Sequence, residues 1–296
     1  MKFKLEGNIP ALITPMKKDL EIDFDALRRF VDFQIENGVD AVLPCGTTGE
    51  SATMSHQEHK KVIKTVVDQV NGRIPVLAGT GSNSTKEAID LTKYAEDVGA
   101  DACLLICPYY NKPTQRGLIN HFKIVAESTN LPVVLYNVPS RTGRNIEAET
   151  TIELSKIPNI IGIKEASGNL AQIMKIIKNT ENFSVISGDD SLTYTIYMLG
   201  GTGVISVATN IVPRLMSDFI KNLRSENYKD ARSYHYKLLD LFNVLFIETN
   251  PGPVKEAASL FKIAGISNWF LRPPLINPTP ENSKKIKETI DALKVF

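Results

Sequence analysis

The chain has 296 residues, of which 43% are hydrophobic and 23% are charged, a composition typical of a globular protein. The 34 Lys and Arg residues nearly balance the 33 Asp and Glu residues, so no net charge favours a nucleic-acid or membrane partner. The N-terminal apolar run is too short for a secretory signal, no stretch is long enough to cross a bilayer, and the 3 cysteines are too few for a disulfide framework. We therefore expect a reduced, cytoplasmic, enzyme-sized protein with one large α/β barrel or two small domains.

Short β-branched runs alternate along the chain with amphipathic stretches. Eight of these runs predict strands, at residues 8–14, 40–46, 74–81, 101–110, 131–137, 160–166, 183–190 and 201–210. The stretches between them predict helices, at residues 23–37, 55–70, 84–98, 114–129, 147–156, 169–179 and 190–199. Ser55 with Glu58, and Ser84 with Glu87, form S-x-x-E capping boxes that mark two of the helix starts.

This alternation also predicts the fold class. Strands that are apolar on both faces and alternate with helices are typical of a parallel sheet covered by helices. Eight such units favour an α/β fold of the (β/α)8 TIM-barrel type over an open doubly wound sheet, which usually has fewer strands and often a glycine-rich phosphate loop after the first. After the last strand the pattern is purely helical, at residues 213–224, 226–249, 253–264 and 281–294. We expect a catalytic barrel over residues 1–224, with a C-terminal helical appendage over residues 225–296 packed on it.

A lysine closes the sixth predicted strand, in the stretch "NIIGIKEASG". Because side chains alternate along a strand, Lys164 shares a face with Gly162, and we expect it to point into the barrel mouth with space beneath it at the glycine. Burial lowers the pKa of an amine, and a neutral amine can form a Schiff base with a carbonyl. The alternative is a structural lysine neutralised by Asp189 or Asp190, since Glu165 points to the opposite face.

Other strand ends carry polar side chains that suit the same chemistry. Tyr136 ends the strand before Lys164 and could relay protons, although taken alone it is better explained as an ordinary strand-end aromatic residue whose hydroxyl meets solvent. Thr47 and Thr48 lie between two glycines and could form a small nest for a carboxylate, or simply a tight turn. Arg141 could hold a carboxylate with its planar guanidinium, or lie in a solvated loop.

Metal and phosphate sites are poorly supported by the sequence. His56 and His59 could share a ligand, but His121 and His235 lie in predicted helices and no third ligand is apparent. The seventh predicted strand ends in two aspartates, which would repel a phosphate. We therefore predict no metal site.

Six motifs follow one another along the chain: "GTTGES", "PYYNKPTQRGL", "LYNVPSRTG", "GIKEASG", "SGDD" and "GVISV". In this order and at these separations they closely resemble the dihydrodipicolinate synthase family. This family belongs to the pyruvate-dependent class I aldolases, which form Schiff bases and also include N-acetylneuraminate lyase. The resemblance covers essentially the whole chain, including the helical C-terminal region.

The resemblance implies a reaction and the residues that perform it. Lys164 would form a Schiff base with pyruvate, and the resulting enamine would attack aspartate semialdehyde before the adduct cyclises, which is the first committed step of diaminopimelate and lysine synthesis. Thr47 and Tyr136 would relay protons together with Tyr110 of a neighbouring subunit. The resemblance implies no metal or organic cofactor and a homotetramer built as a dimer of dimers. Substrate binding would involve Thr48 for the pyruvate carboxylate, Arg141 for the aldehyde's carboxylate, and the backbones of Gly188 and Ile205.

Some members of this family are inhibited by lysine, bound at a subunit interface. The matching positions here are Ser51, Ala52, His56, His59, Asn83, Glu87 and Tyr109. These residues include an acid for an ammonium, an amide and an aromatic wall, and we expect inhibition that is not simply competitive with pyruvate. The plainer interpretation is that the histidines are solvated first-turn residues, that Glu87 completes a capping box, and that Tyr109 packs at an interface.

Two other functions compete with this interpretation. One is a related lyase or aldolase acting on sialic acid or a 2-keto-3-deoxy sugar acid, but those lyases resemble "YNIPALTG" where this chain has "YNVPSRTG" with Arg141. The other is a catalytically idle barrel, which would be expected to lack Lys164 or the tyrosines.

Overall fold

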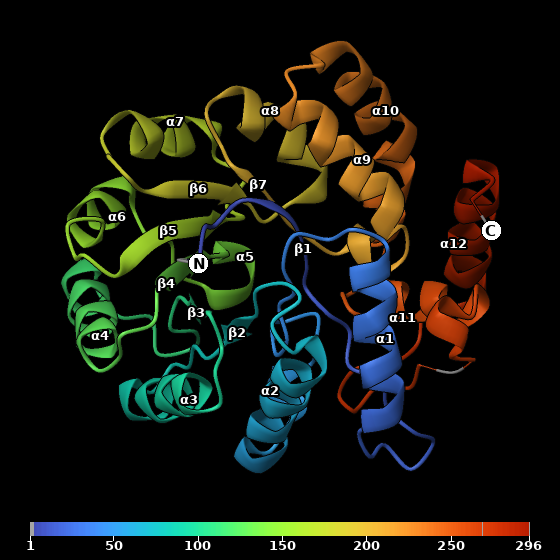
Figure 1. The fold of residues 1–296 in the computed structure, drawn as a ribbon, viewed down its shortest axis with the longest axis horizontal. Coiled ribbons are helices and arrows are strands. Elements are labelled where there is room, and N and C mark those ends of the chain that lie inside the picture. Colours follow the sequence, from blue (N-terminus) through green and yellow to red (C-terminus); the bar gives the residue numbers. More distant parts are fainter. Residues whose placement is uncertain (1–2, 268, 296) are drawn as a thin grey trace. The chain divides into compact units, whose positions relative to one another are not determined.

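The computed structural model describes residues 3–267 and 269–295 (Figure 1). The chain divides into two compact units, which are described separately. Unit 1 comprises the residues up to Glu6 together with Pro75–Ile205, and unit 2 comprises Gly7–Ile74 together with the residues from Ser206 onward. The predicted boundary between residues 224 and 225 stays a prediction.

Unit 1 is built on parallel strands. These are β2 (Leu77–Gly79), β3 (Ala102–Ile106), β4 (Val133–Asn137), β5 (Ile160–Glu165), β6 (Ser184–Ser187) and β7 (Gly203–Ser206), of which β7 reaches unit 2 with its last residue. Strands β2 to β5 each pair in parallel with the next strand along the chain, and β6 pairs with β7 through Ser187 and Val204. Strands β3, β4 and β5 are mostly apolar and almost entirely buried, as a sheet covered by helices requires.

The helices of unit 1 follow its strands (Figure 1). They are α3 (Thr85–Asp97), α4 (Gln115–Glu127), α5 (Pro139–Thr142), α6 (Ala148–Leu154), α7 (Leu170–Lys178) and α8 (Thr193–Met198). Helix α4 illustrates the pattern, because Leu118, Phe122 and Val125 recur at helical spacing and are buried. The short helix α5 is absent from the sequence prediction; it begins at Pro139, a residue suited to the first helical position.

Unit 2 contains β1 (Gly7–Pro10) and is otherwise mainly helical. Its helices are α1 (Phe24–Glu36), α2 (His56–Val70), α9 (Pro213–Arg224), α10 (Tyr228–Val244), α11 (Gly252–Leu260) and α12 (Pro280–Leu293). The ring of Phe30 on α1 packs edge-on against Trp269, with centroids 5.1 Å apart. Across the described part of the chain, no helix combines the length and the apolar character needed to span a membrane.

One predicted strand is wrong. Residues 40–46 form no continuous strand. Val42 and Leu43 are isolated bridge residues, Leu43 pairs in parallel with Ala11, and the amides of Asp40 and Leu43 donate to carbonyls of the chain around β1. Pro44 has no N–H to continue the pairing, and Cys45 has a φ of 57° that turns the chain out of the extended conformation. Over residues 3–267 and 269–295 the structure therefore has seven strands where the sequence predicted eight.

One of the two predicted capping boxes is confirmed in full. Ser55 and Glu58 exchange both hydrogen bonds, with the Glu58 amide donating to Ser55 Oγ at 3.2 Å and the Ser55 amide to Glu58 Oε2 at 2.8 Å. For the second box only the first half is present, since the Glu87 amide donates to Ser84 Oγ at 3.5 Å. The Glu87 carboxylate instead accepts from Ser82 Oγ at 2.7 Å, so the second half of this prediction is wrong.

Candidate active site

Lys164 lies at the C-terminal end of β5, where it is paired with Tyr136 on β4. Its side chain is only 6% exposed, and its Nζ lies 4.3 Å from the centroid of the Tyr136 ring. Burial lowers the pKa of Lys164 to about 7, while the negative charge of Asp190 raises that pKa and the positive charge of Arg141 lowers it. Near neutral pH a large share of this amine is therefore uncharged and able to attack a carbonyl.

Two glycines control the space around Lys164. A Cβ on Gly188 would lie 3.0 Å from Lys164 Cε and 2.8 Å from the Ala166 Cβ, so a side chain at position 188 would press on the lysine. At Gly162, which we expected to leave space beneath the lysine, a Cβ would meet the Ser184 carbonyl oxygen at 2.4 Å and the Leu5 side chain at 2.7 Å. That expectation is wrong, because the N-terminal segment and the next strand occupy the space. The room for the lysine comes from Gly188.

The other predicted residues of unit 1 lie on or beside the same strand ends. Tyr136 is buried in β4, and Arg141 lies in α5, which follows β4 directly. Ile205 is buried in β7, the neighbour of β6. Tyr110, by contrast, is 90% exposed and has a φ of +71°, a backbone conformation that is unusual for a bulky residue.

A buried polar cluster lies beside the Lys164–Tyr136 pair, and the sequence analysis did not identify it. Asn137 and Glu165 directly follow the two site residues and are partners across β4 and β5. Asn137 Nδ2 donates to Glu165 Oε1 at 3.1 Å, and Gln172 on α7 donates to Glu165 Oε2 at 3.2 Å. Burial raises the pKa of Glu165. A signal existed in the sequence, since two polar residues at adjacent strand ends are unusual in buried strands.

Thr47 and Thr48 belong to unit 2, where they lie in a tight turn. The amides of Gly49 and Glu50 donate to the carbonyl oxygens of Gly46 and Thr47, at 3.1 and 3.0 Å. Thr48 is 3% exposed, and its Oγ1 accepts a hydrogen bond of 3.0 Å from Nδ2 of Asn250, a residue that the sequence analysis did not single out.

The predicted effector residues are divided between the two units. In unit 1, Asn83 Nδ2 donates to the Tyr109 carbonyl oxygen at 3.1 Å, so these two residues lie together. In unit 2, His59 is only 6% exposed, which contradicts its interpretation as a solvated first-turn residue. The remaining members are Ser51 and Ala52 in a short 3-10 turn, His56 at the start of α2, and Glu87 in the first turn of α3.

The comparison with known proteins decides the family. The family model described as the dihydrodipicolinate synthetase family matches residues 4–293. The chain belongs to this family. Among its curated relatives, the 4-hydroxy-tetrahydrodipicolinate synthase of Syntrophotalea carbinolica is 52% identical over 285 residues, which cover 96% of both chains.

Solved structures of dihydrodipicolinate synthases agree with this assignment. One from Acinetobacter baumannii, complexed with pyruvate, is 41% identical with a TM-score of 0.95, and the match covers 99% of this chain and 100% of that chain. One from Cyanidioschyzon merolae with lysine bound is 39% identical with a TM-score of 0.94, over 98% of this chain and 99% of that chain. The likeness confirms the predicted fold class, an α/β barrel followed by C-terminal helices.

Proposed function

We propose that this member of the dihydrodipicolinate synthetase family condenses pyruvate with aspartate semialdehyde, as a 4-hydroxy-tetrahydrodipicolinate synthase, in the first committed step of diaminopimelate and lysine synthesis. The observation that carries the proposal is Lys164, an amine buried at a strand end with a pKa lowered to about 7. A lysine in this state is the nucleophile that Schiff-base chemistry needs. The name borne by the 52% identical relative supports the same reaction.

The chemistry begins at the neutral Lys164 nitrogen. This nitrogen attacks the ketone carbon of pyruvate, the new C–N bond forms, and the ketone oxygen leaves as water to give an imine. Loss of a methyl proton then yields an enamine, whose carbon adds to the aldehyde. The amine of the aldehyde substrate finally displaces Lys164 as the ring closes. Each step moves a proton, and we assign this relay to Tyr136, whose ring lies beside the amine, together with Thr47 and Tyr110.

The two substrate carboxylates need hydrogen-bond donors. We assign the pyruvate carboxylate to Thr48 and the carboxylate of aspartate semialdehyde to Arg141, whose planar guanidinium can donate two parallel hydrogen bonds. The influence of Arg141 on the pKa of Lys164 supports its place near the reacting amine. The backbones of Gly188 and Ile205 would line the pocket, and the close approach of Gly188 to Lys164 supports its part.

Reductive trapping tests the proposal. Borohydride with pyruvate should leave a covalent pyruvyl adduct on the peptide that contains Lys164, detected by mass spectrometry. Lys164→Ala should abolish the adduct, while Lys156→Ala, which removes an exposed lysine, should leave it intact. An adduct that persists in Lys164→Ala would mean that another lysine is the nucleophile. If trapping succeeds, a panel of aldehydes distinguishes the synthase from a sialic acid or 2-keto-3-deoxy sugar acid aldolase, and failure of trapping would favour an idle barrel.

A homotetramer arranged as a dimer of dimers is the second part of the proposal. The exposure and the strained backbone of Tyr110 support a role for this side chain outside its own subunit. Mixing Tyr110→Phe with Lys164→Ala subunits should restore some activity, because a hybrid can contain one intact site. No recovery despite demonstrated subunit exchange would place Tyr110 in its own chain's site. A cytoplasmic location, and a division into a catalytic barrel over residues 1–224 and a helical region over residues 225–296, stay proposals from the sequence.

Inhibition by lysine is the third part of the proposal. The lysine-bound structure of the Cyanidioschyzon merolae enzyme supports it, as does the contact between Asn83 and Tyr109. Calorimetry at millimolar lysine should record binding, and Glu87→Ala should weaken it through loss of the acid that would face the ammonium. Full activity with no binding heat would overturn the assignment of an effector site.

A further inference from the structure

The turn that carries Thr47 and Thr48 is held from several sides. Thr14 Oγ1 donates to the Gly49 carbonyl oxygen at 2.8 Å, and a Cβ on Gly49 would lie 2.9 Å from the Leu12 carbonyl oxygen. Glu50, which follows, has a left-handed backbone with φ 60° and ψ 34°. The turn therefore packs closely against the chain that precedes it, and it has little freedom to shift.

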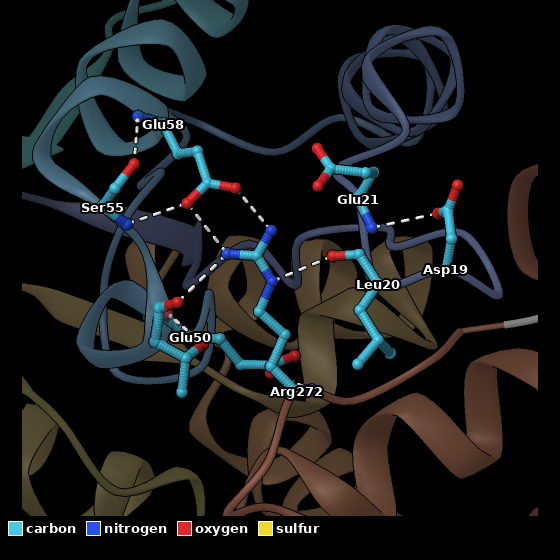
Figure 2. A network of polar contacts seen from close by, with 8 residues as sticks. Asp19, Leu20, Glu21, Glu50, Ser55, Glu58 and Arg272 are labelled. Atoms are coloured by element: carbon cyan, nitrogen blue, oxygen red, sulfur yellow. Dashed lines mark hydrogen bonds and ion pairs between the residues drawn. The ribbon is translucent and has the colours of Figure 1, made fainter.

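The buried Glu50 side chain anchors the end of this turn. One carboxylate oxygen forms an ion pair with Lys255, and both of these side chains are fully buried. The other accepts from the amide of Arg272 at 3.0 Å. Figure 2 shows how the Arg272 guanidinium extends onward to the Glu58 carboxylate and to the Leu20 carbonyl oxygen, which ties the C-terminal segment to the start of α2.

Asn250 acts on the turn in a more specific way. It is 4% exposed, and its Nδ2 donates to Thr48 Oγ1 at 3.0 Å. A threonine hydroxyl has one hydrogen to donate and two lone pairs that accept. Because one lone pair is engaged by the amide of Asn250, the single hydrogen of the Thr48 hydroxyl points away from Asn250 and is left to donate elsewhere.

We propose that Asn250 is a positioning residue, which turns the Thr48 hydroxyl so that its hydrogen is presented to the pyruvate carboxylate. The inference rests on the proposed role of Thr48 in holding that carboxylate. Asn250 does not itself touch the substrate. It determines which way the hydroxyl donates, while the Glu50 anchor keeps the backbone of the turn in place.

The test is a double-mutant cycle on the purified, assembled enzyme, read as the KM for pyruvate, the KM for the aldehyde and kcat. Thr48→Val keeps the shape of the side chain and removes the hydroxyl, so it should raise the KM for pyruvate. Asn250→Ala should also raise the KM for pyruvate, by roughly fivefold or more, because a directed hydrogen bond is lost. In the Thr48→Val background, Asn250→Ala should add almost nothing, since the hydroxyl it acts on is gone.

Asn250→Asp supplies a second variant of nearly unchanged size, and circular dichroism of both Asn250 variants controls for a folding defect. Its carboxylate accepts the hydroxyl hydrogen and turns Thr48 away from the substrate, so the KM for pyruvate should rise further than in Asn250→Ala. If Thr48→Val leaves the KM for pyruvate unchanged, the proposed role of Thr48 fails. If Thr48→Val raises it but the Asn250 variants do not, or if their effects persist in the Thr48→Val background, Asn250 does not act through Thr48 and the inference is overturned.

Discussion

Asp190→Asn should lower the pKa of Lys164. In the wild-type chain, burial brings that pKa down to about 7, and the negative charge of Asp190 raises it against this effect. Asparagine has nearly the same shape as aspartate but no charge, so the substitution leaves burial and the positive charge of Arg141 to act alone. The reactive, neutral form of the amine should then persist to lower pH.

The size of the effect follows from the fraction of neutral amine. With a pKa of about 7, about a tenth of Lys164 is neutral at pH 6, about half at pH 7 and about nine-tenths at pH 8. An ordinary lysine, with a pKa of about 10.4, would be neutral in only about one molecule in 2,500 at pH 7. The gain in attack rate for Asp190→Asn therefore cannot exceed about tenfold at pH 6 and about twofold at pH 7, and it should vanish above about pH 8.

The assay is the initial rate of reductive trapping with pyruvate, measured from about pH 5.5 to about pH 8.5. Asp189→Asn is the matched control, because it removes a charge from the adjacent position and retains the Oδ1 that accepts from the Ser191 amide. Circular dichroism should show that both variants fold. The reasoning would be refuted if the midpoint of the Asp190→Asn profile stayed in place or rose, or if the control shifted it equally.

Three further results are expected. Arg141→Ala should raise the KM for aspartate semialdehyde about tenfold or more, because a charge-assisted contact of about 1.5–3 kcal/mol is lost, while trapping of pyruvate at about pH 8 should change little. If pyruvate trapping and the KM for the aldehyde were impaired equally, Arg141 would have a structural role. Lys255→Met should lower the free energy of unfolding by about 3–5 kcal/mol in urea titrations, because the buried Glu50 carboxylate loses its ion-pair partner. Adding Glu50→Gln should recover part of the loss, and no recovery would mean that the ion pair is not the cause. Burial lowers the pKa of His121 to about 4, whereas in the unfolded chain its pKa is about 6.5, so the unfolded chain binds the proton first as pH falls, and the free energy of unfolding should drop by up to about 3 kcal/mol between about pH 6.5 and about pH 4. His121→Leu should remove this drop, and an unchanged pH dependence in the variant would contradict the prediction.

Features that depend on local pattern were predictable from the sequence. The position of Lys164 at a strand end follows from the alternation of side chains along β5, and the structure places Tyr136 directly across from it on β4. The helix starts at Ser55 and Ser84 were also predictable, because capping acts within one turn. These features need only a few neighbouring residues for their definition.

Features that depend on distant segments were not predictable in this way. The strand predicted at residues 40–46 is cut short at Pro44, which has no N–H to continue the pairing, although the apolar run around it resembles a strand. The space beneath Lys164 is filled by Leu5, a residue from the N-terminal segment. The hydrogen bond from Asn250 to Thr48 joins residues separated by 202 positions, and an asparagine beside a proline reads locally as a turn. No periodicity in the sequence connects such partners.

The two lysines that are buried in the described part of the chain show what separates a nucleophile from a structural cation. Burial lowers the pKa of both, of Lys164 to about 7 and of Lys255 to about 8. Lys255 is held by an ion pair with Glu50 and by a hydrogen bond of 2.7 Å to the Phe270 carbonyl oxygen, so its charge is satisfied where it lies. Lys164 instead lies beside the Tyr136 ring and close to Gly188, and the negative charge of Asp190 raises its pKa against the effect of burial. With a pKa of about 7, Lys164 lies near the midpoint of its titration at neutral pH, where the amine can lose a proton to attack and regain one as the reaction proceeds. Because Lys255 is engaged by Glu50 and by the Phe270 carbonyl oxygen, it is the surroundings of each amine, and not burial alone, that favour Lys164 as the residue that traps the carbonyl.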